Sequence, residues 1–372
     1  MTSDTIYPNA TVTAAITANP GGVGLNAAGS TAPLTLTSDS LGLVNFQIYA
    51  GTVPGPVQVK LSLNDLAYAF SSNITVQSGP PAQDRFSLSA ASYNLEGQDI
   101  DGITTTLTIR VADRQGNAVP DGTVINFTSG GGQIQPSCAT TKANGISSCS
   151  VTFSSQQPRP AAQYGRVPIL AFAEGVKIYA DNNRNNSFDI GADTLTDMGD
   201  AYRDDNENGS YDAGEFVLPR GGSDSCPTGA GGVPARSNTC DSRTAATTVR
   251  RQIVLLMATS KAEFSEWTRS SSAASFRVNS TTACEDGSKC LPLASGTRLS
   301  ATTSKVAECV AATPVPEVVS AVASTLDRNA QLGSFHSVLL TPADGKTCSG
   351  KTLSITATSP SGVVSMGNYT IP

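Results

Sequence analysis

Apolar and polar residues alternate in short segments along the whole chain, and this pattern restricts the fold more than any other feature. A period of two places successive side chains on opposite faces of a β-strand. Turn residues separate the segments roughly every 8–12 positions, as in a β-sandwich. One weak helical stripe, residues 316–323, is β-branched enough to suit a strand. The predicted strands include Val44–Tyr49, Val57–Leu63, Leu107–Val111, Val124–Thr128 and Leu353–Ala357. The sequence therefore predicts an all-β protein.

The length of 372 residues suits two or three domains. Weak internal repeats agree with this estimate, because residues 42–48 match 145–151 and residues 119–124 match 293–298, each a glycine turn followed by an alternating strand. A Gly/Pro linker occupies residues 78–82, and a Gly/Pro-rich loop ends near residue 243. We predict three tandem β-sandwich units: a partial or truncated unit at residues 1–78, a middle unit at 83–243 with an insertion at 175–243, and a C-terminal unit at 244–372.

The eight cysteines indicate disulfide bonds. The chain has no C-x-x-C pair and a single histidine, so it lacks the ligand set of a zinc site. Disulfides form in oxidising compartments, which predicts a location outside the cytoplasm. Eight cysteines allow on the order of 100 pairings, and the short separations favour sequential pairs. For the first pair, a four-residue loop at 142–145 would place both cysteines on adjacent strands. The predicted pairs are Cys138–Cys149, Cys226–Cys240, Cys284–Cys290 and Cys309–Cys348.

Several motifs of the middle unit resemble those of a known domain family. They are Asn117–Thr123, Val124–Thr128, the glycine run Gly130–Gly132 and Gly145–Phe153. Together, residues 100–215 resemble a bacterial Ig-like domain of the invasin/intimin type (group one). Residues 39–42 and 53–57 resemble only the later strands of such a domain, and residues 292–302 and 348–360 resemble it more loosely. The resemblance implies tandem immunoglobulin-like β-sandwiches on a bacterial surface, where such domains act as spacers, adhesive tips or assembly modules.

The negative charge of the chain is concentrated in the insertion. Residues 181–215 contain ten acidic and two basic side chains, a net charge of −8, whereas the rest of the chain carries +2. So many like charges in a short segment would repel one another and leave it mobile unless a cation binds there. The composition as a whole, with 15% charged and 6% aromatic residues, excludes a basic nucleic-acid-binding protein.

The second half of this segment matches a twelve-position calcium loop at every position. Calcium takes six to eight oxygen ligands, which alternate residues of a tightly curled loop supply, with a bidentate Glu at the end. Gly209 stands at position 6, where the loop turns sharply. The predicted ligands at positions 1, 3, 5, 7, 9 and 12 are Asp204, Asn206, Asn208, Ser210 (through its carbonyl), Asp212 and Glu215.

A second copy of the loop lies 23 residues upstream. Asn186 replaces the glycine and can adopt the left-handed conformation. Position 12 is Ala192, which cannot bind a metal, so either Asp193, Asp197 or Asp200 would complete the site or the two loops would share ligands. The alternative to a metal site is a solvated acidic loop with turn-forming Asx residues. The predicted ligands of this loop are Asp181, Asn183, Asn185, Ser187, Asp189 and Asp193. Two copies favour calcium in a structural role, since extracellular calcium saturates even weak sites.

Catalytic motifs are missing from the sequence. His336 lies in an alternating segment and is expected to be a strand residue, and no nucleophile elbow, zincin motif or phosphate loop is present. Trp267 is expected to belong to a core, with a ligand platform as the alternative. The sequence predicts that the protein is not an enzyme.

No export signal and no membrane-spanning run are found in the sequence. If the disulfide prediction holds, the signal lies outside this chain. We predict a bacterial cell-surface or secreted protein whose calcium-stiffened units display a binding surface to a host or surface receptor. Two alternatives are a self-assembling filament or sheath subunit that exchanges strands with neighbouring copies, and a carbohydrate-binding accessory module with a glycan as partner.

Overall fold

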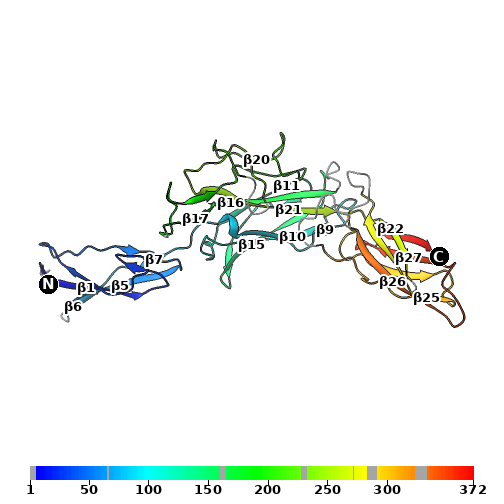
Figure 1. Cartoon of the computed structure of the whole chain (residues 1–372), viewed down its shortest axis with the longest axis horizontal. Helices are drawn as coiled ribbons and strands as arrows, with labels where there is room; N and C mark the ends of the chain where they lie inside the picture. The colour runs from blue at the N-terminus through cyan, green and yellow to red at the C-terminus, as the bar shows by residue number, and fades with distance from the viewer. Residues whose placement is uncertain are drawn as a thin grey trace.

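A computed structural model describes residues 6–64, 67–159, 165–183, 185–227, 233–270, 272–282, 291–322 and 333–372. In this part of the chain the regular structure consists of β-strands and one short 3-10 turn, η1 (Gln83–Arg85). The strands form three units that follow one another along an elongated molecule, with the N- and C-termini at opposite ends (Figure 1). The protein is therefore an all-β protein of tandem immunoglobulin-like sandwiches.

The first unit is a thin sandwich with a small core. Its main sheet has the order β3-β1-β5-β6, with β7 also pairing with β5, and β2 and β4 form a separate pair. Its buried cluster contains Ala14, Leu25 and Val59, and Tyr68 and Phe70 on β6 are 66% and 50% exposed. Its strands are β1 (Thr11–Ala18), β2 (Gly24–Leu25), β3 (Leu34–Thr37), β4 (Ile48–Tyr49), β5 (Gly55–Leu63), β6 (Ala67–Phe70) and β7 (Ile74–Val76).

Two five-stranded sheets form the middle unit. One sheet contains the path β12-β15-β10-β8 with β14 beside β15, and the other has the order β13-β11-β16-β21-β9. Alternate residues of β10 are buried, including Leu107, Ile109 and Val111, and pack in the core between the sheets. The strands are β8 (Phe86–Ala90), β9 (Asn94–Leu95), β10 (Thr104–Val111), β11 (Val124–Ser129), β12 (Gln133–Ile134), β13 (Ser137–Ala139), β14 (Thr141–Ala143), β15 (Ile146–Ser154), β16 (Arg166–Val176) and β21 (Ala246–Met257).

An insertion between β16 and β21 covers the outer face of these two strands. Both are buried almost continuously along their length, without the alternation of β10. Arg250 and Gln252 of β21 bond to backbone groups of the insertion, which shows what lies over this face. The insertion contains two small hairpins, β17 (Ile178–Ala180) with β18 (Thr194–Thr196) and β19 (Ala201–Tyr202) with β20 (Val217–Leu218).

The C-terminal unit packs a four-stranded sheet, β22-β23-β26-β25, against a three-stranded sheet, β24-β27-β28. Its core includes Phe276, Val338, Leu353 and Ile355. The strands are β22 (Ala262–Arg269), β23 (Ala273–Ser280), β24 (Arg298–Thr303), β25 (Cys309–Ala311), β26 (Ser334–Pro342), β27 (Thr352–Thr358) and β28 (Val364–Thr370).

Three details of the sequence prediction are wrong. The boundary before residue 244 lies too early, because β21 pairs with β16 over eleven positions and completes the middle unit. Of Val44–Tyr49, only the last two residues form a strand. Residues 316–323 form neither a helix nor a strand where they are described; Val318 makes an isolated bridge to Arg298.

Three of the predicted disulfides are present, Cys138–Cys149, Cys226–Cys240 and Cys309–Cys348. Cys284 and Cys290 lie outside the described residues. The prediction that Cys138 and Cys149 lie on adjacent strands of a hairpin is wrong. The hairpin turn is the pair Asn144-Gly145 between β14 and β15, and Cys138 lies on β13 in the opposite sheet. The bond therefore links the two sheets of the sandwich.

Candidate metal centre

Each of the two predicted calcium loops connects the strands of one insertion hairpin. Residues 181–193 join β17 to β18, and residues 203–216 join β19 to β20. The ladder of the second hairpin extends by a bond from Arg203 N to the Phe216 carbonyl oxygen (2.8 Å). Both acidic loops therefore have the same local context, the connection between the two strands of a hairpin in the insertion.

The second loop curls around the carboxylate at its first position. Asp204 Oδ1 accepts from Asn208 N (3.1 Å) and Oδ2 from Gly209 N (2.8 Å). Asn208 Oδ1 accepts from Ser210 N (2.7 Å). At the end of the loop, Glu215 closes it with both oxygens, which accept from Asp205 N (2.8 Å) and Asp212 N (3.0 Å).

The first loop repeats these hydrogen bonds. Asp181 accepts from Asn185 N (3.1 Å) and Asn186 N (2.8 Å), the residues at positions 5 and 6. Asn186 has a φ of 64°, so it adopts the left-handed conformation that Gly209 adopts in the other copy. Asn185 Oδ1 accepts from Ser187 N (2.8 Å).

Asp193 takes the place that Glu215 has in the second loop. Its two oxygens accept from Asn182 N (2.8 Å) and Asp189 N (2.8 Å), at positions 2 and 9. Asp193 stands at position 13. Its side chain is shorter than that of Glu215, but it comes one residue later and accepts from the N–H groups at the same two positions. Ala192, at position 12, contributes through its backbone: its carbonyl oxygen accepts from Asn182 Nδ2 (2.7 Å) and its N–H donates to the Asp189 carbonyl oxygen (3.2 Å).

Amide groups surround the carboxylate at position 9 of each loop. Asn206 and Asn208 donate their Nδ2 groups to Asp212 Oδ2 (2.7 and 2.6 Å), and Asn183 and Asn185 donate to Asp189 Oδ2 (2.8 and 2.5 Å). The bonds from Asn183 and Asn185 lower the pKa of Asp189 below its usual value.

In the described part of the chain, no group of three Asp, Glu, His or Cys side chains converges as a metal ligand set. The carboxylate and carboxamide oxygens of these loops are nevertheless the hard donors that calcium prefers.

The second loop is anchored in the sandwich. Asp204 is 4% exposed, its N–H donates to Gln252 Oε1 (3.0 Å), and its carbonyl oxygen accepts from Gln252 Nε2 (2.8 Å). Arg166 of β16 forms a bidentate pair with Glu207 (2.6 and 2.7 Å). Burial, together with the nearby charge of Glu215, raises the pKa of Asp204 despite the bonds from Gly209 and Asn208. A cation beside this carboxylate would offset that desolvation.

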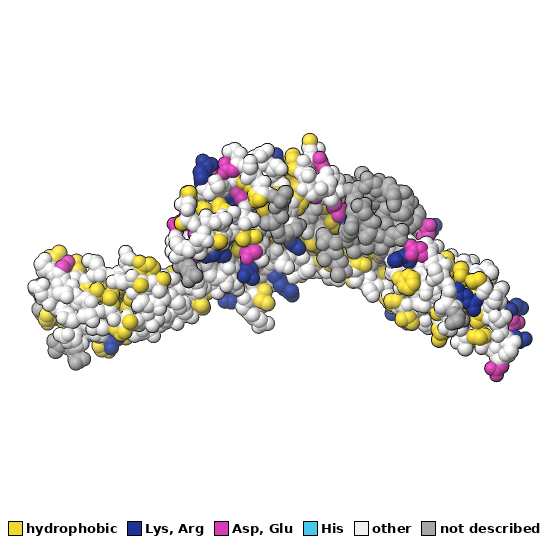
Figure 2. All heavy atoms as spheres, in the orientation of Figure 1, with side chains coloured by type: hydrophobic (Ala, Val, Ile, Leu, Met, Phe, Trp, Pro, Cys, Tyr) yellow, Lys and Arg dark blue, Asp and Glu magenta, His cyan; other side chains and the backbone are white. Residues whose placement is uncertain are grey.

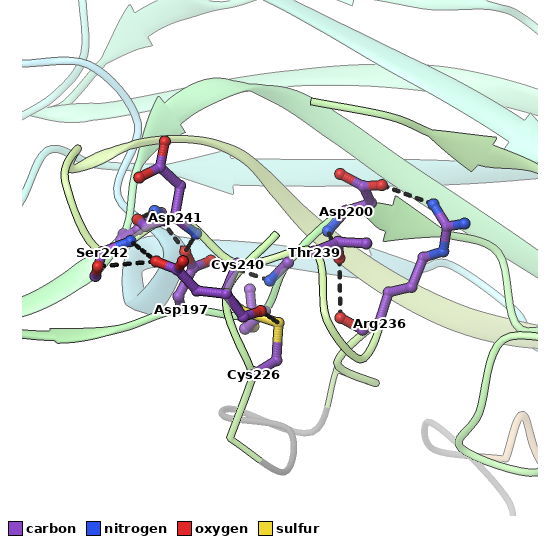
Figure 3. Close-up of a disulfide and its surroundings, with 12 residues drawn as sticks. Asp197, Asp200, Cys226, Arg236, Thr239, Cys240, Asp241 and Ser242 are labelled. Atoms are coloured by element: carbon purple, nitrogen blue, oxygen red, sulfur yellow. Dashed lines mark hydrogen bonds and ion pairs between the residues drawn. A yellow bond between two sulfur atoms is a disulfide. The ribbon is translucent and has the colours of Figure 1, made fainter. Parts of the chain in front are cut away.

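Two further aspartates of the insertion serve its structure and do not complete the first loop. Asp197 pairs with Lys177 (2.5 Å) and accepts from Asp241 N (2.9 Å). Asp200 pairs with Arg236 (2.6 Å) and accepts from Arg220 N (2.9 Å). Figure 3 shows both aspartates beside the Cys226–Cys240 disulfide. Of the three carboxylates predicted to complete the upstream loop, the geometry favours Asp193, which closes the loop, over Asp197 and Asp200, which pair with Lys177 and Arg236.

The sequence analysis missed Arg250, which joins the insertion to the sheet. It is fully buried, and its guanidinium donates to the carbonyl oxygens of Gly199 (3.0 Å), Met198 (2.8 Å) and Pro234 (3.1 Å). Burial lowers the pKa of Arg250 to about 10. A charged residue between the apolar residues of β21 was the available signal.

His336 and Trp267 lie in the C-terminal unit, far along the chain from the loops. His336 is fully buried, and its ring nitrogens contact the Pro316 carbonyl oxygen and Ser334 Oγ (both 2.7 Å). Burial lowers the pKa of His336. Trp267 stacks between Phe276 (4.8 Å between centroids) and Tyr369 (5.1 Å). Both residues serve the packing of this unit.

Comparisons with known proteins give no family at the level of sequence, since no family model and no curated protein matches the chain. Similar solved structures include the D0–D1 domain of intimin, at 18% identity over 45% of this chain and 75% of that chain, with a TM-score of 0.17. Invasin, a bacterial integrin-binding protein, has 10% identity over 98% of this chain and 53% of that chain, with a TM-score of 0.27. The Yersinia pseudotuberculosis adhesin InvE has 13% identity over 79% of this chain and 60% of that chain, with a TM-score of 0.22. The chain thus spans little more than half the length of the invasin chain. The fold assignment rests on the strand pairing described above.

Proposed function

We propose that this protein is a structural and adhesive component displayed outside a bacterial cell, with its tandem units holding a binding surface away from the point of attachment. The observation that carries this proposal is the end-to-end arrangement of three sandwich units (Figure 1). Disulfides in both larger units support an oxidising, extracellular location. Within the described residues there is no helix with the length and apolar character that crossing a membrane requires.

The visible surface agrees with a displayed protein. In Figure 2 most of it is uncharged, and apolar side chains lie in small separate groups. Small, separate apolar groups, without one large apolar patch on this face, favour solubility. The partner of the binding surface would be a host or surface receptor.

The location is tested with antibodies against the chain on intact cells of the source bacterium. We expect labelling without permeabilisation and loss of the label when trypsin is added to the intact cells, or recovery of the protein from the medium. Thiol alkylation of the recovered protein should find its cysteines oxidised. Labelling that appears only after permeabilisation, with free thiols, would contradict the proposal.

Calcium is the second part of the proposal, as a ligand that stiffens the insertion. The support is that two loops with different sequences form the same hydrogen bonds around the same positions. Asp204, Asn206, Asn208, Asp212 and Glu215 would hold one ion, and Asp181, Asn183, Asn185, Asp189 and Asp193 a second. The asparagine amides would have to turn their oxygens inward, replacing their bonds to Asp212 and Asp189. The ion would neutralise part of the negative charge of this segment.

Limited proteolysis of the full chain tests this role. Calcium should slow cleavage between residues 181 and 215 and raise the melting temperature of the middle unit, relative to the same protein in EDTA. An Asp181→Ala/Asp204→Ala variant should lose both effects. Asp344→Ala, which removes an exposed carboxylate of the C-terminal unit, is the matched control and should keep them. Equal cleavage of the wild-type chain in calcium and in EDTA would overturn the calcium proposal and leave the displayed location untouched.

A further inference from the structure

The connection between the middle and C-terminal units is bonded along its length. Residues 258–261 join β21 to β22, and three of their N–H groups have partners. Ala258 N donates to the Leu95 carbonyl oxygen (2.7 Å), Thr259 N to Ser280 Oγ (2.9 Å) and Ser260 N to Asp99 Oδ2 (2.8 Å). Because these partners lie in both units, the connection is held from both sides and is not a free linker.

Asn94 on β9 ties the two units together. It is fully buried, and its Nδ2 donates to the carbonyl oxygens of Leu293 (2.6 Å) and Ser320 (3.2 Å). Its Oδ1 accepts from Val322 N (3.1 Å) and its carbonyl oxygen from Ser295 N (3.1 Å). All four partners are backbone groups of the C-terminal unit. Movement between the units would leave these buried groups unpaired, which is costly.

Glu96, two residues further along, bonds to a different element of the C-terminal unit. It is 2% exposed, and its carboxylate accepts from Ser361 N (2.9 Å) and Ser361 Oγ (2.5 Å) in the turn between β27 and β28. Burial acts to raise the pKa of Glu96, but hydrogen bonding, first of all from Ser361, outweighs it and lowers the pKa below its usual value. The carboxylate is therefore charged at neutral pH and is stabilised by donors across the junction.

Apolar packing adds to these bonds. Val254 and Leu256 of β21 form a buried cluster with Leu291 of the C-terminal unit, and Val322 packs against it. β9 also pairs in parallel with the end of β21, the strand that leads into residues 258–261. Asn94 lies on β9 and Glu96 directly follows it, so both are close to the start of this connection. Figure 1 shows β9 at the end of the middle unit that faces β22.

The junction between the first and middle units has a different construction. Gly79 N is bonded to Asp113 Oδ2 (3.0 Å), which holds the end of the linker on the middle unit. Within the described residues, the hydrogen bond between the two units themselves runs from Asn117 Nδ2 to the Thr52 carbonyl oxygen (2.7 Å) and is exposed. Water can replace such a bond at little cost.

We propose that the middle and C-terminal units form one rigid body with a fixed elbow between them, latched by Asn94 and Glu96, and that the first unit pivots on this body at residues 77 and 78, just before the bonded Gly79. This device consists of residues other than those of the calcium loops. It orients the C-terminal unit relative to the middle unit without a bound ion, and it leaves the direction of the first unit variable.

Distances between spin labels in the full chain test this proposal. Nitroxide-carrying p-acetylphenylalanine, placed at the exposed positions Thr35, Thr152 and Thr302, leaves the disulfides intact. We expect a narrow distance distribution for the pair at 152 and 302 and a broader one for the pair at 35 and 152, both in calcium and in EDTA. Equal widths for the two pairs would overturn the proposal. Narrowing of the broad distribution by calcium alone would place the ion at the first junction, and would contradict the separation of the two devices.

Variants of the latch provide a second measurement. In differential scanning calorimetry, the middle and C-terminal units of the wild type should unfold in one transition. Asn94→Ala should split that transition, and so should Glu96→Gln. Ser361→Ala removes one donor to Glu96 from an exposed turn without emptying a buried site, so it should broaden the distribution between positions 152 and 302 in a folded protein. Asn117→Ala at the first junction is the matched control and should leave that distribution unchanged. Two separate unfolding transitions in the wild type would contradict the latch. So would an unchanged distance distribution in Ser361→Ala combined with an unsplit transition in Asn94→Ala.

Discussion

At the scale of single residues, the two acidic loops differ in how they close. Glu215 at position 12 and Asp193 at position 13 accept from the same pair of backbone N–H groups of their loops. An aspartate has one methylene fewer than a glutamate, and the additional residue in the loop compensates for its shorter reach. A sequence template with fixed spacing therefore treats the first loop as incomplete at Ala192, although an equivalent carboxylate stands next to it.

This closure predicts which substitution removes the upstream site. Asp193→Ala should lower the calcium affinity of the first loop about tenfold or more, because one charged ligand is lost. Isothermal titration calorimetry should then detect one strong site where the wild type has two. Ala192→Ser, at the neighbouring exposed position, serves as the control and should keep both. Two unchanged sites in the Asp193 variant would show that this carboxylate does not bind the ion.

At the scale of elements, the disulfide between Cys226 and Cys240 restrains a segment that packs against the second loop. It closes a segment with a sequence separation of 14 that contains Arg236. The guanidinium of Arg236 pairs with Asp200 and lies over the ring of Tyr211, 4.4 Å from its centroid. Tyr211 stands at position 8 of the second loop, so the disulfide limits how far that loop can open.

Removal of this disulfide should therefore affect calcium binding as well as stability. A Cys226→Ser/Cys240→Ser variant should lose about 3 kcal/mol of stability in the middle unit, from the greater freedom of its unfolded chain. Its second loop should also bind calcium severalfold more weakly. Calorimetric unfolding and titration would measure both changes. Cys309→Ser/Cys348→Ser is the matched control in the C-terminal unit, and should reduce the stability of that unit with calcium affinity unchanged. Wild-type calcium affinity in the Cys226→Ser/Cys240→Ser variant would contradict the role of this disulfide in restraining the second loop.

At the scale of the whole molecule, the two junctions divide the chain into parts with different freedom. Asn94 and Glu96 bond the middle unit to two separate elements of the C-terminal unit. A single exposed hydrogen bond, from Asn117, spans the first junction in the described chain. Among the described residues, the first unit also has the smallest core, with a buried cluster of Ala14, Leu25 and Val59. The spin-label distances therefore test how freely one unit moves relative to the next, which is a property of the whole chain and not of any single unit.

Much of the fold follows from local sequence. The period-two pattern predicts Val57–Leu63, Leu107–Val111 and Leu353–Ala357, and all three lie in strands. This succeeds because a strand with one buried face needs alternate apolar residues. The prediction fails for Val44–Tyr49, most of which lacks a partner strand in the thin first unit. It also fails for the boundary at residue 244, because a long insertion separates β16 from its partner β21.

The sequence by itself determined most of the strands and the two Asx loops, since each depends on residues that are near one another in the chain. It also predicted the three disulfides that the structure describes, of which Cys309–Cys348 spans a separation of 39 residues. Tertiary structure alone decided that Asp197 and Asp200 pair with Lys177 and Arg236, that Cys138 lies in the sheet opposite Cys149, and that Asn94 and Glu96 reach the C-terminal unit. These contacts join groups that come together only when sheets pack and units dock. Periodicity and spacing describe the chain over a few residues, and they contain no information on which distant group will offset the burial of a charge.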